Sequence, residues 1–160
     1  MELKLLEGGA IMIRGARVLG GQFRNFKGGP DKFNKAGGRR YFHISMEDDI
    51  AQALNENNWR VKILPPKEEG DDSLNIMKVN INFGGFRPPK IYGVTNGKSV
   101  RYDEEMTDEL DYSDILFVDL VLNPYEAQDG INSAYLEEGR FNIRAEYFAS
   151  EYDEEEVPFE

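Results

Sequence analysis

The sequence predicts a mostly β fold with one or two short helices, in the form of a small β-barrel or Greek-key domain. Short runs of branched and aromatic residues recur along the chain, and glycine, proline and asparagine interrupt them at short intervals. At 160 residues the chain suits one domain, which we place at residues 1–149. Acidic residues without apolar periodicity dominate residues 150–160, so we expect a disordered tail there.

The first strand signal is long and curved. Residues 10–26, AIMIRGARVLGGQFRNF, are rich in branched and aromatic side chains, and Gly15, Gly20 and Gly21 mark the expected bulges or bends. Residues 28–38, GGPDKFNKAGG, follow and are a loop by composition. The sequence therefore predicts one bent strand that leads into a glycine-rich loop.

The next segments alternate between strand and helix signals. Residues 39–46 alternate and predict a strand, whereas residues 46–57 begin with acids, carry apolar residues at helical spacing and end in asparagine, which predicts a short helix. Residues 59–64 predict another strand, which two prolines stop before a charged loop. Residues 75–83, NIMKVNINF, alternate strictly and predict a half-buried strand.

The C-terminal half continues the β pattern. An asparagine–glycine pair inside residues 90–103 is a two-residue turn that matches the twist of strands, so this segment predicts a hairpin. Residues 103–111 predict a helical turn. Residues 114–125 are nearly continuously apolar and predict a central strand, and residues 134–148 predict the last one.

The net charge of −11 is unevenly distributed. Residues 1–45 contain nine Lys and Arg against three Asp and Glu, a net charge of +6, whereas residues 46–160 contain ten against twenty-seven, a net charge of −17. Such a chain can present a cationic surface locally while it remains acidic overall. Chance clustering of surface charge is the alternative.

Composition also limits the chemistry. Cysteine is absent and only one histidine is present, which excludes disulfides, cysteine-ligated metals and multi-histidine sites. The first residues lack a cationic leader with a cleavage site, and no apolar run approaches the roughly 20 residues of a membrane helix. We therefore expect a cytoplasmic protein without membrane contact.

No catalytic signature is present in the sequence. His43 has no serine or acid at an informative spacing, and the glycine pairs form neither a P-loop nor a dinucleotide-binding loop. The acidic residues 102–114 lack the ligand alternation of a calcium loop. Asp119, inside an apolar strand, is better interpreted as a partnered structural acid than as a catalytic one. We predict no enzyme activity, no cofactor and no metal.

Cations and aromatic residues interleave between residues 23 and 42 and again near residues 59–62 and 86–92. Single-stranded nucleic acid requires both, because cations neutralise phosphates and flat rings stack on unpaired bases. The alternative is a cationic loop whose rings belong to the core, and for Trp59 core burial and base stacking both stay open. The residues expected to contact nucleic acid are Arg24, Phe26, Lys27, Lys32, Phe33, Lys35, Arg39, Arg40, Tyr41, Trp59, Lys62, Arg87, Lys90 and Tyr92.

A basic and aromatic β domain followed by DEEEVPFE resembles the bacterial and phage single-stranded-DNA-binding proteins, and the pattern FRNFKG … FNKAGGRRYF … AQALNENNWRVK is similar to a phage-encoded branch of them. The resemblance implies an OB-like barrel with additional strands that coats single-stranded DNA in replication and recombination. It also implies that the tail docks replication and repair proteins through its apolar tip. The implied docking residues are Asp153, Glu154, Glu155, Glu156, Val157, Pro158 and Phe159.

Two features depart from the family's pattern. The phenylalanine usually ends the chain, whereas Glu160 follows Phe159 here, which changes the docking geometry or the set of partners. The helix predicted at residues 46–57 follows the second strand, whereas a five-stranded OB barrel usually has its helix after the third. An additional strand would account for this difference.

The leading hypothesis is a non-catalytic, sequence-tolerant single-stranded-DNA-binding protein, located in the host cytoplasm if a phage encodes it. Its expected partners are single-stranded DNA, replication and recombination proteins and, as a further option, other copies of itself. The alternative is an acidic interaction or DNA-mimic protein that docks onto replication or defence machinery without binding DNA. A virion or scaffold component is a third option.

Overall fold

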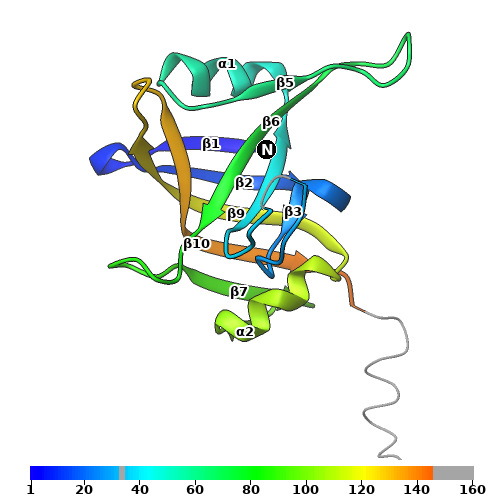
Figure 1. Cartoon of the computed structure of the whole chain (residues 1–160), viewed down its shortest axis with the longest axis vertical. Helices are drawn as coiled ribbons and strands as arrows, with labels where there is room; N and C mark the ends of the chain where they lie inside the picture. The colour runs from blue at the N-terminus through cyan, green and yellow to red at the C-terminus, as the bar shows by residue number, and fades with distance from the viewer. Residues whose placement is uncertain (33–34, 146–160) are drawn as a thin grey trace, which may run out of the picture.

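Five strands close into a barrel at the centre of the molecule (Figure 1). The computed structural model describes residues 1–32 and 35–145. In their order around the barrel, the five strands are β2 (Ile11–Val18), β4 (Arg40–Met46), β6 (Leu74–Ile81), β10 (Asn132–Ile143) and β9 (Ile115–Glu126).

One parallel pairing closes the barrel. Neighbouring strands pair antiparallel from β6 through β4, β2 and β9 to β10. Strands β6 and β10 then pair in parallel, with Val79 opposite Ala134 and Asn80 opposite Tyr135. The closed barrel confirms the mostly β, OB-like fold class that the sequence predicts.

The additional strands extend this barrel at its edges. Strand β1 pairs with β2, β3 with β4, and β5 with β6, while the β7–β8 hairpin joins the barrel because β7 pairs in parallel with β10. These strands are β1 (Glu2–Leu5), β3 (Arg24–Asn25), β5 (Lys62–Leu64), β7 (Lys90–Thr95) and β8 (Lys98–Tyr102).

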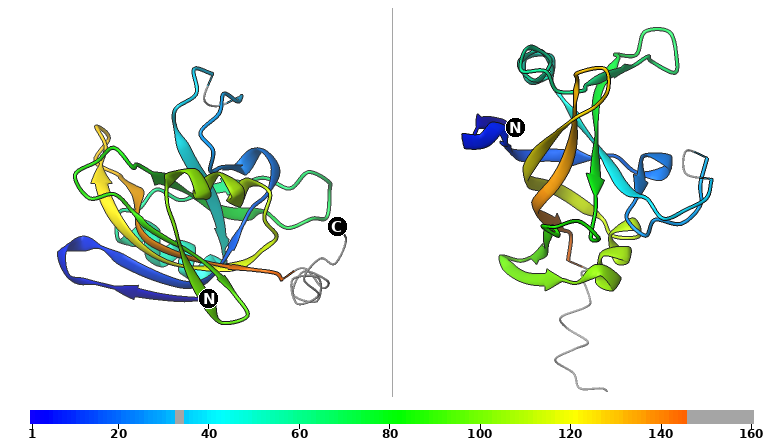
Figure 2. Two further views of the ribbon diagram at one scale, coloured as in Figure 1. Left: turned by 90° about the horizontal axis from the view of Figure 1, so that it is seen from below. Right: turned by 60° about the vertical axis from the view of Figure 1, so that its left-hand side comes forward.

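Two short α-helices lie at opposite ends of the barrel (Figures 1 and 2). Helix α1 (Asp48–Glu56) follows the second barrel strand, as the sequence predicts, and α2 (Glu104–Thr107) continues into the 3-10 turn η3 (Asp108–Asp111). Helix α2 follows the third barrel strand and the hairpin, so the usual OB position is also occupied. In the described part of the chain, no helix has the length and apolar character needed to cross a membrane.

The predicted strand at residues 10–26 is wrong as one element. Gly15, at φ 73°, does mark a bulge in the pairing of β2 with β9, but the chain leaves the strand after Val18. The 3-10 turn η2 (Gly21–Phe23) then separates β2 from the short β3. Because Gly21 adopts φ 61°, a left-handed conformation that glycine tolerates, the turn forms at this point.

The strand at residues 75–83 and the hairpin turn are as predicted, whereas the strand at residues 59–64 differs from its prediction. The strict alternation of residues 75–83 corresponds to β6, and the hairpin turns at Asn96 and Gly97, both with positive φ, as expected. The predicted strand at residues 59–64 is shorter, because only β5 pairs along a strand and Trp59 makes a single bridge to Asn132.

Three phenylalanine rings form the aromatic centre of the core. Phe26 stacks on Phe42 with a centroid distance of 5.0 Å, and Phe141 meets each of them edge-on at 5.4 Å. All three rings are fully buried. Since replacing a buried phenylalanine with alanine costs about 3–5 kcal/mol, this cluster fixes the β3 end of the chain onto the barrel.

Candidate nucleic-acid interface

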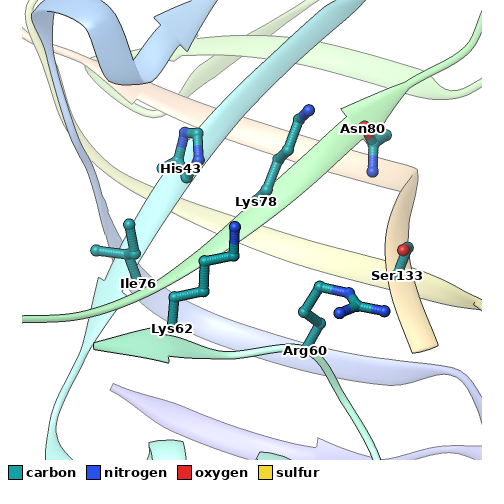
Figure 3. Close-up of a pocket in the computed structure, with 7 residues that line it drawn as sticks. All are labelled: His43, Arg60, Lys62, Ile76, Lys78, Asn80 and Ser133. Carbon is teal, nitrogen blue, oxygen red and sulfur yellow. The ribbon is translucent and has the colours of Figure 1, made fainter. Parts of the chain in front are cut away.

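The outward faces of β4 and β6 form a polar surface on the barrel. Side chains alternate along a strand, so Phe42 and Ile44 of β4 point into the core while Tyr41 and His43 point outward. Lys78 of β6 pairs in register with His43, and both side chains rise from neighbouring strands in Figure 3. This alternation gives the barrel an apolar interior and an outer surface that can contact a ligand.

Two adjoining hollows on this surface make up the groove. They share Lys78 and Asn80, so they form one continuous depression across β4, β6 and β10. The residues that line the first hollow are His43, Arg60, Lys62, Ile76, Lys78, Asn80 and Ser133 (Figure 3). The residues that line the second are Gly38, Arg39, Arg40, Lys78, Asn80, Ile81, Asn82 and Tyr135.

Positive charges in the groove repel one another. Partial burial lowers the pKa of Lys78, and the neighbouring charges of Arg39 and Lys62 lower it further. Burial likewise lowers the pKa of His43, and Lys78 and Lys62 add to that effect. Within residues 1–32 and 35–145, neither Lys62 nor Lys78 forms an ion pair. An anionic ligand would relieve this repulsion, which is the electrostatic character expected of a phosphate-binding surface.

The loop between β3 and β4 carries four of the nine basic residues predicted to contact nucleic acid and projects from the barrel (Figure 2). Its ends are joined by a hydrogen bond from the Gly38 amide to the Gly28 carbonyl, 2.7 Å long. Lys27, Lys32, Lys35 and Arg39 have exposed side chains. The loop therefore presents cations at the edge of the groove.

Tyr41 lies beneath this loop and is only 2% exposed. Its hydroxyl donates a 2.6 Å hydrogen bond to Asp31, and Lys78 Nζ lies 4.6 Å from the centre of its ring. Burial and the Asp31 carboxylate raise the pKa of Tyr41 to about 12. In this conformation Asp31 and the loop cover the ring that the sequence predicts to contact nucleic acid.

Two predicted contact arginines hold the fold together instead of presenting free guanidinium groups. Arg24 donates to the backbone carbonyls of Leu19, Leu110 and Ser113, and burial lowers its pKa. This side chain therefore anchors β3 to the segment that follows α2.

Arg40 makes a similar structural contact. It donates a 2.8 Å hydrogen bond to the Phe26 carbonyl and forms a 2.7 Å ion pair with Asp108. Its guanidinium lies 5.2 Å from the centre of the Phe83 ring. The reason is topological, because β3 and the start of β4 lie against α2 and η3, whose acids and carbonyls accept these donors.

Two predicted stacking rings are buried. Phe26 is fully buried in the aromatic core, so the expectation that it contacts a base is corrected. Trp59 is 3% exposed and lies in the core, which agrees with the first of its two interpretations. Phe33 and the predicted docking residues 153–159 lie outside the described residues.

The remaining predicted residues divide between two surfaces. Lys62 lies in the groove with His43 and Lys78, whereas Arg87, Lys90 and Tyr92 lie near or on the β7–β8 hairpin. Lys62, Arg87 and Lys90 are exposed, and Tyr92 is half-buried.

The sequence reading missed Lys78, Asn80 and Tyr135 as groove residues. The alternation of residues 75–83 had already placed Lys78 and Asn80 on the polar face of their strand, but it could not identify the neighbouring strands. Tyr135 enters the groove because β10 closes the barrel beside β6. Its ring lies 5.7 Å from that of Tyr125, which is exposed.

Asp119, the acid inside the apolar strand, accepts a 2.9 Å hydrogen bond from the Gly15 amide. Across residues 1–32 and 35–145, no group of three His, Asp or Glu side chains is placed to hold a metal ion.

Comparison with known proteins identifies a family for the chain. No match was found among curated proteins or among solved structures. A family model described as "Putative phage ssDNA-binding domain" matches residues 3–159, nearly the whole chain. The chain therefore belongs to this phage single-stranded-DNA-binding domain family.

Proposed function

We propose that this protein binds single-stranded DNA in the groove, without catalysis and with little sequence preference. The observation that carries the proposal is the set of mutually repelling cations around the groove: Lys78 on β6, Lys62 on the neighbouring strand β5, and Arg39 just before β4. In an OB barrel, the second and third barrel strands and the adjacent loops form the face that binds oligonucleotides. Family membership supports single-stranded DNA as the ligand.

Aromatic residues next to these cations can bind the bases. Tyr135 lines the groove beside Asn80, and Tyr125 lies opposite Ser133 on the neighbouring strand, with its ring tilted by 59° against that of Tyr135. A base stacked on such a ring gains about 1–3 kcal/mol largely independently of sequence. The proposed site therefore combines phosphate neutralisation with stacking.

The test is a titration of a fluorescently labelled dT oligomer at several salt concentrations, with duplex DNA as the comparison. We expect tight binding of the single strand at low salt. The logarithm of the affinity should fall with the logarithm of the salt concentration, with a slope of about −0.7 per phosphate neutralised. Arg39→Glu should weaken binding strongly, whereas Lys4→Glu, on β1, should not. An absence of binding at low salt would refute the function.

We further propose a role in phage replication or recombination, with the acidic tail as a recruitment segment. Acids in residues 153–156 keep such a segment away from DNA by repulsion, and Val157, Pro158 and Phe159 offer a small apolar surface to a protein partner. A tail tethered near a cationic groove also competes with DNA as an intramolecular anion.

Deletion of residues 150–160 tests both parts of the tail proposal. The deleted protein should bind single-stranded DNA modestly more tightly and should lose its partners from a pull-down with host and phage proteins. Weaker DNA binding would contradict the competition. A full-length protein that captures partners but ignores DNA would instead favour the acidic interaction or DNA-mimic alternative.

A further inference from the structure

A second group of cations and aromatic rings lies on the β7–β8 hairpin, outside the groove. Tyr92 of β7 pairs in register with Arg101 of β8 on one side and with Arg140 of β10 on the other. The guanidinium carbons of Arg101 and Arg140 lie 5.5 Å and 4.2 Å from the centre of the Tyr92 ring. Both distances are within the roughly 6 Å range of cation–π contacts.

The loop between β6 and β7 enlarges this surface. Phe86 at its tip is 99% exposed, and Arg87 and Lys90 are exposed beside it. Phe86, Lys90 and Arg101 line one shared hollow. We call this surface the hairpin patch; its residues are Phe86, Arg87, Lys90, Tyr92, Arg101 and Arg140.

The strands beneath the patch are firmly seated on the barrel. Ile91 is fully buried, and the ring of Tyr102 packs directly onto Gly93, where an added Cβ would lie 2.5 Å from the ring. A substitution at Gly93 would therefore push the Tyr102 ring of β8 away from β7. Because the support is rigid, Tyr92 and Arg101 are presented in a fixed arrangement.

Most of the positive charge in the patch is available to a ligand. Arg140 forms a 3.2 Å ion pair with Glu138. Among the described residues, Arg87, Lys90 and Arg101 form no ion pair. A fully exposed phenylalanine next to these cations has the composition that stacks bases and neutralises phosphates.

One strand, β10, connects the groove to the hairpin patch. Ser133 and Tyr135 on its outward face line the groove, and Arg140 further along the same strand belongs to the patch. Arg140 lies five positions after Tyr135, which corresponds to roughly 16 Å along a strand. Strands β6 and β7 pair with successive parts of β10, so the two surfaces follow each other on one side of the barrel.

Acidic side chains of β10 border the patch, because Glu137 and Glu138 line the same hollow as Phe86, Lys90 and Arg101. Glu137 and Glu138 lie at the bulge in the β9–β10 pairing, between Tyr135 and Arg140. Their carboxylates repel phosphates at this point. A bound strand would therefore contact the groove and the exposed cations of the patch, but not these carboxylates.

We propose that the hairpin patch is a second contact region for the single strand of DNA that occupies the groove. The inference rests on the proposed function. Once a long strand is bound in the groove, its continuation is held near the patch at a high effective concentration, so a modest second contact adds strongly to affinity. A short oligomer fills the groove alone and does not gain from the patch.

The test compares dT oligomers of about 4 and about 16 nucleotides, the two ends of the range of OB-fold site sizes. The variant Phe86→Ala/Lys90→Gln/Arg101→Gln removes one ring and two charges from exposed positions of the patch. Loss of one stack and two phosphate contacts should weaken binding of the long oligomer by about tenfold or more, and change that of the short one by less than about twofold.

A matched control variant is Tyr112→Ala/Lys4→Gln/Lys98→Gln, which removes one ring and two charges from exposed positions outside the patch. It should bind both oligomers as the unmodified protein does. Unchanged binding of the long oligomer by the patch variant would overturn the inference and would favour a protein as the ligand of the patch. Equal weakening of both oligomers would also overturn it. Failure of the unmodified protein to bind either oligomer would instead refute the proposed function.

Discussion

Replacing Lys78 with methionine should weaken DNA binding while leaving the fold intact. The substitution keeps a long apolar stem in the groove and removes the charge. The fold loses a cation–π contact with Tyr41, worth about 0.5–1 kcal/mol at an exposed site. The substitution also removes two unfavourable effects on the folded state: the partial burial of a charged amine, and its repulsion by Arg39 and Lys62, which together lower the pKa of Lys78. Because these effects have opposite signs, the free energy of unfolding should change by less than about 1 kcal/mol.

The effect on binding can be worked out from the charges in the groove. If Arg39, Lys62 and Lys78 each neutralise one phosphate, the logarithm of the affinity falls with the logarithm of salt concentration with a slope of about −2.1. Without Lys78 the slope is about −1.4. Between 50 and 200 mM salt, the affinity should therefore fall about 18-fold for the unmodified protein and about 7-fold for Lys78→Met.

Fluorescence anisotropy with a labelled dT oligomer measures these slopes, and a thermal melt followed by circular dichroism checks the fold. Lys98→Met is the control, since Lys98 is an exposed cation on the hairpin strand β8. A Lys78→Met protein that binds with the unmodified slope would show that this side chain contacts no phosphate. The reasoning that places DNA in the groove would then fail.

Three further predictions concern single residues of the site. Burial lowers the pKa of His43, so the side chain is neutral at pH 7. Acidification should therefore add a cation to the groove and tighten DNA binding, and His43→Gln should abolish this effect. Because the unfolded chain takes up the proton before the folded protein does, folding stability should also decline as the pH falls below about 6.5. NMR of this lone histidine gives its pKa directly; a value above 6.5 would contradict the stability part, and pH-independent binding would contradict the binding part. Asp31→Asn should tighten DNA binding, because the carboxylate over Tyr41 repels phosphates; equal or weaker affinity in the anisotropy assay would count against this. Buried Trp59 should resist acrylamide quenching and keep its emission maximum when DNA binds, and a large shift would indicate stacking.

Local patterns in the sequence predicted the elements that depend on local interactions. Strict alternation was sufficient to predict β6, and the asparagine–glycine pair was sufficient to predict the hairpin turn. Both signals depend only on consecutive residues: the two-residue period of a strand, and the residue types of a turn. The segment 10–26 was not predictable in the same way. Its apolar content suits a strand throughout, and the pairing of β2 with β9 and β4, together with the turn at Gly21, decides where that strand ends.

The site was less predictable than the fold, for the same physical reason. Interleaved cations and rings indicated the kind of ligand, but not which rings lie in the core. Phe26 is buried because the pairing of β3 with β4 brings the Phe26 ring onto Phe42. No local pattern in the sequence predicts that pairing. Lys78 becomes a groove residue only through its register with His43.

The same contacts explain how an acidic chain can carry a cationic groove. The surplus of positive charge in residues 1–45 suggests that the binding site lies there, yet Arg24 and Arg40 are held by backbone carbonyls and by Asp108. Lys62 and Lys78, from the acidic part of the chain, take their place in the groove because β5 and β6 lie beside β4. Substitutions at Arg24 or Arg40, chosen by charge along the sequence, would therefore remove structural contacts and unfold the β3–β4 edge. Substitutions at exposed groove residues such as Lys78 should remove the proposed ligand contacts and leave the barrel intact, so they separate loss of binding from loss of folding.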